Sequence, residues 1–98
     1  MNCDVVIKVL RQHEADIRAF GAMAVYLYGS TRHDTARPDS DVDLFIDRDP
    51  ARPFGLLELT GLEEFLQDVL QARVDLSTRS SLHPALRPAI ERDAIRVV

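Results

Sequence analysis

Apolar residues recur along the chain at two spacings, every three to four residues in some segments and every second residue in others. The first spacing is typical of a helix that buries one face, and the second of a strand that does so. The sequence therefore predicts helix 5–20, strand 24–28, strand 42–47, helix 60–72, strand 73–77, helix 86–93 and strand 95–98. Helices interspersed with strands in this order predict one α/β (α+β) domain over 1–98, with a mixed β-sheet and helices packed on it.

Local signals refine some of these elements. Thr60 and Glu63 have the spacing of a capping box at a helix start, although a start nearer Phe54 stays open. His13 lies on the apolar side of the first helix, where we expect a half-buried histidine bonded locally rather than a ligand. Pro38 predicts an extended approach to the second strand.

Composition changes the picture mainly by exclusion. The chain is 46% hydrophobic and 29% charged, as in ordinary soluble globular proteins, and no stretch approaches a membrane span. Its net charge of −4 argues against nucleic acid as a direct partner. The one cysteine, Cys3, excludes an internal disulfide and fits a reducing cytoplasm, which is the expected location. We expect its thiol to be inert.

Acidic residues at alternate positions open the second strand. Asp41 and Asp43, preceded by Asp39, fall on the strand face opposite its apolar side chains. Two carboxylates about 5 Å apart repel by roughly 3 kcal/mol at an effective dielectric near 20. We therefore expect a cation between them. Asp75, flanked by apolar residues in the third strand, is the candidate for a third acid beside them.

Four interpretations of these acids compete. A calcium loop of EF-hand type fails because it needs a glycine where Leu44 stands and a glutamate where Pro50 stands. A phosphate loop of Walker type fails because its lysine and upstream glycine are missing. Acids that protect a strand edge from aggregation are a third possibility. In the fourth, Gly29 and Ser30 bind phosphate while the carboxylates hold Mg²⁺.

Gly29-Ser30, followed by ten residues and then Asp41-x-Asp43, resembles the DNA polymerase β-like nucleotidyltransferase superfamily. The stretches ARPDSDVDLFID and RVDLST look like the minimal nucleotidyltransferases, which are the antitoxins of HEPN/MNT toxin–antitoxin pairs. The resemblance implies a nucleotidyltransferase-like fold. It also implies transfer of AMP from ATP to a tyrosine of a HEPN ribonuclease toxin, which would block the toxin.

The resemblance also implies a role for each matching residue. Gly29 and Ser30 would hold the nucleotide phosphates. Asp41, Asp43 and Asp75 would be the catalytic acids that bind two Mg²⁺ ions, with Asp75 the candidate general base. Because the chain offers no second domain to hold an acceptor, we expect a partner protein to present it.

The loop after Ser30 departs from the family pattern GSRARG, since it reads Thr31-Arg32-His33-Asp34. Arg32 and His33 stay candidate nucleotide-binding residues. Asp34 tolerates a positive φ, so the turn is expected to survive, but its charge is unfavourable beside a triphosphate. Arg37 is either a phosphate or toxin contact or a solvated loop arginine.

Three functions therefore stay open on the sequence alone. The leading hypothesis is a Mg²⁺-dependent protein adenylyltransferase that acts on a toxin. The second is an antitoxin that neutralises its toxin by binding, without chemistry, and the altered loop motivates it. The third, a transferase that modifies a small molecule, is disfavoured because no acceptor domain is present.

Overall fold

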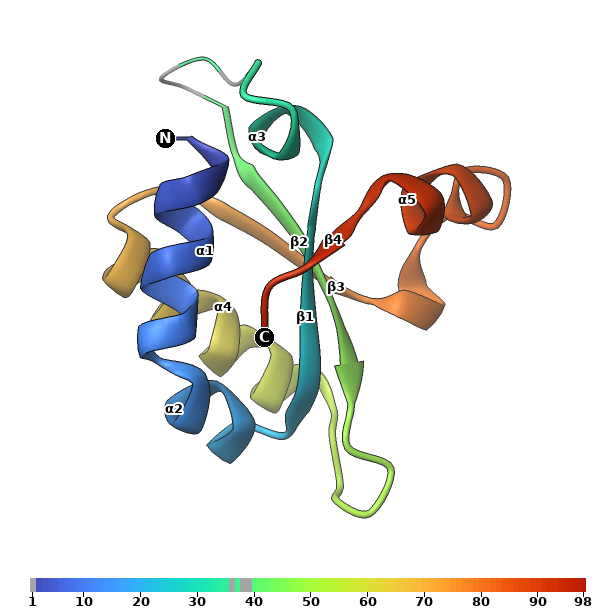
Figure 1. Cartoon of the computed structure of the whole chain (residues 1–98). Helices are drawn as coiled ribbons and strands as arrows, with labels where there is room; N and C mark the ends of the chain where they lie inside the picture. Colours follow the sequence, from blue (N-terminus) through green and yellow to red (C-terminus); the bar gives the residue numbers. More distant parts are fainter. Residues whose placement is uncertain (1, 36, 38–39) are drawn as a thin grey trace.

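The computed structural model describes residues 2–35, 37 and 40–98, so the predictions for Pro38 and Asp39 lie outside the described residues. In order, its elements are α1 (Cys3–Gln12), α2 (Glu14–Ala19), β1 (Ala22–Tyr28), α3 (Gly29–Arg32), β2 (Val42–Arg48), α4 (Leu56–Leu70), β3 (Val74–Thr78), the 3₁₀ turn η1 (Arg79–Ser81), α5 (Arg87–Asp93) and β4 (Ile95–Arg96). Figure 1 shows their arrangement. This confirms the mixed α/β (α+β) class. Among the described residues no helix is long and apolar enough to cross a bilayer.

The four strands form one mixed sheet in the order β3-β2-β1-β4. β1 pairs antiparallel with both β2 and β4, whereas β2 and β3 run parallel. Parallel neighbours need a long crossover connection, and α4 supplies it between β2 and β3. β2 is an interior strand of the sheet. Because β2 and β3 are parallel, the acidic residues at the start of β2 lie beside the first residues of β3.

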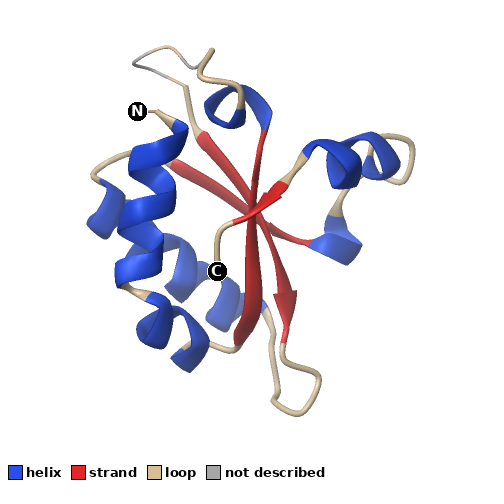
Figure 2. Cartoon of the chain, in the orientation of Figure 1, coloured by secondary structure: helices blue, strands red, loops and turns tan. Residues whose placement is uncertain are grey.

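Helices α1, α2 and α4 cover one face of the sheet (Figure 2). The side chains of Val42, Leu44 and Ile46 point into this layer and are at most 1% exposed, which confirms the apolar face predicted for the second strand. Their partners in the core include Val6, Leu10, Ile17, Val25, Leu27, Leu62, Leu66, Leu70, Val74 and Leu76. The acids of β2 consequently point to the opposite face.

That opposite face is covered in part by aromatic rings and by α5. Tyr26 of β1 stacks on Phe45 of β2, with ring centroids 4.8 Å apart and an interplanar angle of 11°. The guanidinium carbon of Arg79 lies 4.9 Å from each of these two ring centroids. Phe45 is 1% exposed, and these ring and guanidinium contacts contribute to its burial. We call this side of the sheet, with Asp43, Phe45 and Asp75, the open face.

The prediction of one helix over 5–20 is wrong, because the helix is interrupted at His13. This residue has φ −111° and ψ 21°, and a second helix begins at Glu14. Apolar residues keep the same phase on both sides of the break, so their spacing gives no sign of it. The His13 ring packs edge-on against Phe65, with centroids 5.6 Å apart, and its Nδ1 lies 3.6 Å from an Asp16 oxygen. The half-buried position predicted for His13 is confirmed, and its local polar contact is with Asp16.

The predicted capping box at Thr60 and Glu63 is also wrong, since both residues lie inside α4. The helix begins four residues earlier, where the backbone N–H of Gly55 donates to Glu58 Oε2 at 3.0 Å. Leu56 and Leu57 occupy the first turn but are 79% and 86% exposed, so no buried stripe marks this start. The helix ends at Leu70, two residues before the predicted end, because Gln71 adopts a left-handed φ of 52°.

Candidate functional site

The predicted acids meet at the start of β2 and β3. Asp43 pairs across the sheet with Tyr28 of β1 on one side and with Asp75 of β3 on the other. Asp41 directly precedes β2, two residues before Asp43. Side chains at equivalent positions of neighbouring strands share a face. The structure therefore brings together Asp43 and Asp75, with Asp41 beside them.

Burial and the two neighbouring carboxylates act together on the pKa of Asp43. The pKa of Asp43 lies above its usual range, first because the side chain is partly buried and then because Asp75 and Asp41 are negative. Burial, together with the charges of Asp43 and Asp75, raises the pKa of the Tyr28 hydroxyl to about 12. Protection of a strand edge does not explain Asp43, because β2 has neighbours on both sides. The arrangement accumulates negative charge at a point where stability alone gives no reason for it.

Gly29 directly follows β1 and lies in direct contact with this acidic group. Its φ is +76°, and a Cβ built on it would lie 2.4 Å from Asp43 Oδ2. Only glycine lets the backbone of the turn approach the carboxylate this closely. Gly29 is the first residue of the short helix α3, and the carbonyl of Ser30 accepts the Thr35 N–H at 2.9 Å, which closes the turn. The glycine turn and the acids are therefore one packed unit.

The altered loop keeps its turn geometry. Asp34 has φ +56°, as its predicted tolerance of positive φ allows. Its Oδ1 accepts the backbone N–H of Cys3 at 2.8 Å, at the start of α1. The Cys3 side chain is buried at 8% exposure, and burial followed by the nearby Asp34 charge raises the pKa of its thiol. A buried thiol of raised pKa is inert, in agreement with the expectation for Cys3.

Arg32 and His33 are drawn toward α5. The Arg32 Nε donates to the carbonyl oxygen of Asp93 at 3.1 Å, and the His33 Nε2 lies 2.5 Å from Asp93 Oδ2. Asp93 also lines a hollow of about 330 Å³ together with Tyr28, Gly29, Ala89 and Ile90. The two candidate nucleotide-binding residues thus contact a residue in the wall of this hollow rather than the acids.

The carboxylates suit a hard cation that also receives ligands from a substrate. Among the described residues only Asp41 of the three has an ion-pair partner, the Arg73 Nε at 3.5 Å. In the described part of the chain, no group of three or more His, Cys, Asp or Glu side chains is arranged so that it could hold a metal ion by itself. Mg²⁺ is usually bound through one or two carboxylates, with phosphates and waters supplying the rest. Oxygen donors with unbalanced negative charge fit this requirement.

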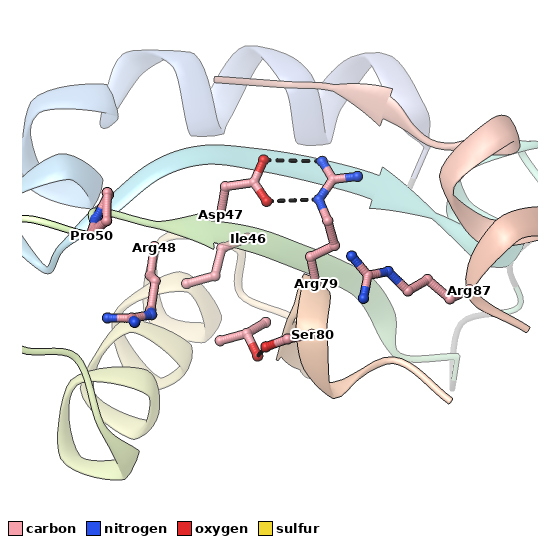
Figure 3. Close-up of a pocket in the computed structure, with 8 residues that line it drawn as sticks. Ile46, Asp47, Arg48, Pro50, Arg79, Ser80 and Arg87 are labelled. Atoms are coloured by element: carbon pink, nitrogen blue, oxygen red, sulfur yellow. Dashed lines mark hydrogen bonds and ion pairs between the residues drawn. The ribbon is translucent and has the colours of Figure 1, made fainter. Parts of the chain in front are cut away.

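A second hollow, of about 290 Å³, lies at the other end of β2 (Figure 3). It is lined by Ile46, Asp47, Arg48, Pro50, Thr78, Arg79, Ser80 and Arg87. The Arg79 guanidinium binds both oxygens of Asp47, at 2.7 and 3.0 Å, and also contacts Glu91 of α5. These hydrogen bonds from Arg79 lower the pKa of Asp47 and of Glu91. This hollow is remote from the three acids, and Arg79 within it ties β2 to α5.

Three residues at the open face were missed by the sequence analysis. Tyr28 could have been found, because strand alternation puts residue 28 on the face of β1 that points away from the core. Asp93 and Arg79 gave no such signal, since their contacts join residues up to 61 positions apart. Long-range ion pairs leave no local pattern in a sequence.

Residues 6–97 match the family described as "Nucleotidyltransferase domain". The chain is 31% identical to the protein adenylyltransferase MntA of Thermococcus cleftensis, over 99% of this chain and 97% of that protein.

Several solved structures are similar, including the following two. One, described as a candidate minimal nucleotidyltransferase, has a TM-score of 0.73 at 31% identity and covers 97% of this chain and 95% of its own. The other, a toxin–antitoxin with AMP-PNP, has a TM-score of 0.69 over 100% of this chain and 73% of its own, and at 22% identity it shows the fold alone. The chain belongs to the nucleotidyltransferase domain family, and it is a nucleotidyltransferase.

Proposed function

We propose that the chain transfers AMP from ATP to a hydroxyl group, with tyrosine as the expected acceptor, of a cognate HEPN ribonuclease toxin and thereby acts as its antitoxin. One observation carries the proposal: Asp43 packs against Gly29 and pairs with Asp75 across β2 and β3. Membership of the family supports nucleotidyl transfer. The names of the similar MntA and toxin–antitoxin proteins support a protein acceptor. We expect the reaction in the cytoplasm, where a lone thiol stays reduced.

In this proposal the residues divide the work. Backbone N–H groups after Gly29 and the Ser30 hydroxyl hold the phosphates. Asp41 and Asp43, with Asp75, would bind two Mg²⁺ ions. Bound Mg²⁺ would neutralise charge on the phosphoryl oxygens. The acceptor oxygen bonds to the α-phosphorus, the bond to the bridging oxygen breaks and pyrophosphate leaves. Asp75 accepts the proton of the acceptor hydroxyl.

The test incubates the chain with its toxin, Mg²⁺ and α-labelled ATP and follows label on the toxin by gel and mass spectrometry. Asp43→Asn and Asp41→Asn should each reduce labelling by at least a hundredfold, as expected for groups that act in the transition state. Asp68→Asn is the matched control, since this exposed residue lies on α4, across the sheet from the acids. Full labelling by Asp43→Asn would contradict the proposal.

A second candidate function is neutralisation of the toxin by binding alone. It is favoured by one observation, namely that Arg32 and His33 both bind Asp93. The same experiment separates the two functions when the toxin's ribonuclease activity is also measured. Inhibition that survives Asp43→Asn without any label indicates a binder, whereas loss of inhibition together with label indicates the enzyme.

A further inference from the structure

Helix α5 lies over the open face of the sheet but is held there by polar contacts. None of its seven residues, all of them described, is buried. Near its middle, Glu91 contacts Arg79 and Arg87 (Figure 3 draws the two arginines). At its end, Asp93 receives Arg32 through its backbone carbonyl and His33 through its carboxylate. The loop that follows Gly29 is thus fastened to the end of α5.

The contact between His33 and Asp93 lies at the hollow beside Gly29, where a bound phosphate would compete with Asp93 for His33. Asp93, Tyr28 and Gly29 line the same hollow of about 330 Å³. A carboxylate and a phosphate oxygen accept the same N–H donors with similar geometry. The His33 Nε2 that lies 2.5 Å from Asp93 Oδ2 can therefore bind one of these anions but not both.

We propose that Asp93 is an internal competitor of the nucleotide. Its carboxylate binds His33, while its backbone carbonyl binds Arg32, and a nucleotide phosphate must displace this carboxylate in order to bind His33. Asp93 thus sets the affinity for nucleotide. The inference rests on the proposed function, since it assumes phosphates beside Gly29.

The test is the affinity for ATP with Mg²⁺, measured by isothermal titration calorimetry. Asp93→Ala should bind ATP roughly fivefold more tightly, because the exposed ion pair that nucleotide must break is worth at most about a factor of five. The side chains of His33 and Asp93 are 50% and 46% exposed, so the substitution should leave the fold intact, as circular dichroism can verify. Asp68→Ala removes the same charge from α4 and should stay within twofold of the unmodified chain.

A double-mutant cycle distinguishes competition for His33 from simple repulsion of ATP by a negative charge. In the His33→Ala background the gain from Asp93→Ala should fall below twofold. A gain that persists there, or no gain in the unmodified background, overturns the inference while ATP binding itself still supports the proposed function. If none of the proteins binds ATP, the inference and the proposed function both fail.

Discussion

Gly29→Ala tests whether the contact between the glycine turn and Asp43 is required for catalysis. An alanine at φ +76° costs about 1–2 kcal/mol of folding free energy, because L-residues with a Cβ are disfavoured in the left-handed region. For a domain of this size, that loss lowers Tm by roughly 4–16 °C. The protein should stay folded at 20 °C, which circular dichroism checks.

The larger effect is on the acidic group. The new Cβ would stand 2.4 Å from Asp43 Oδ2, whereas ordinary contact begins at 3.4 Å, so the carboxylate must move by about 1 Å. A displacement of that size at a reacting centre reduces the rate by about a hundredfold. We therefore expect labelling of the toxin by α-labelled ATP to fall about a hundredfold in the folded variant.

Gly21→Ala is the matched control. Its φ is +108°, so the backbone cost is at least comparable, but its Cβ would meet Phe54 at 3.0 Å instead of an acid. It should lower Tm while leaving the transfer rate of the folded protein within about threefold. Transfer by folded Gly29→Ala at more than a third of the normal rate, or an equal loss in Gly21→Ala, would refute the reasoning.

Three further predictions concern charge and packing. Asp43→Asn should raise Tm by a few degrees in thermal unfolding while abolishing transfer, since it removes about 0.5–1 kcal/mol of burial cost and repulsion at this partly buried carboxylate. Arg79 lowers the pKa of Asp47 and Glu91 in the folded chain, so the native state binds fewer protons than the unfolded state in acid. Stability should therefore fall as pH drops below about 4, measured by urea unfolding, and Arg79→Met should weaken this dependence. Leu66→Ala, at a fully buried position of α4, should cost about 2–5 kcal/mol in urea unfolding.

The parts of the fold that were predictable follow from local rules. Strand alternation placed Asp41 and Asp43 opposite Val42 and Leu44, and an acid flanked by apolar residues pointed to Asp75 on another strand. The structure then puts β3 directly beside β2. Patterns of this kind depend on neighbours within a few residues, which is why they survive in a single sequence.

The parts that were not predictable depend on tertiary contacts. The break at His13 leaves the apolar phase unchanged, and the true start of α4 has two exposed leucines where a buried stripe would have marked it. The contact of His33 with Asp93 spans 60 positions. Arg32 was predicted to bind phosphate because the sequence does not reveal that Asp93, in another helix, accepts its hydrogen bond.

The hydrogen bond from the Cys3 N–H to Asp34 connects the start of α1 to the loop that follows Gly29. Asp34 closes the turn that follows Gly29, and Asn2 caps the same first turn of α1 through the Val5 N–H. In an NMR titration the Cys3 amide resonance should therefore shift when the loop rearranges, although it belongs to the first helix. The backbone amide signal of Cys3 thereby reports on events at the glycine turn from outside the loop.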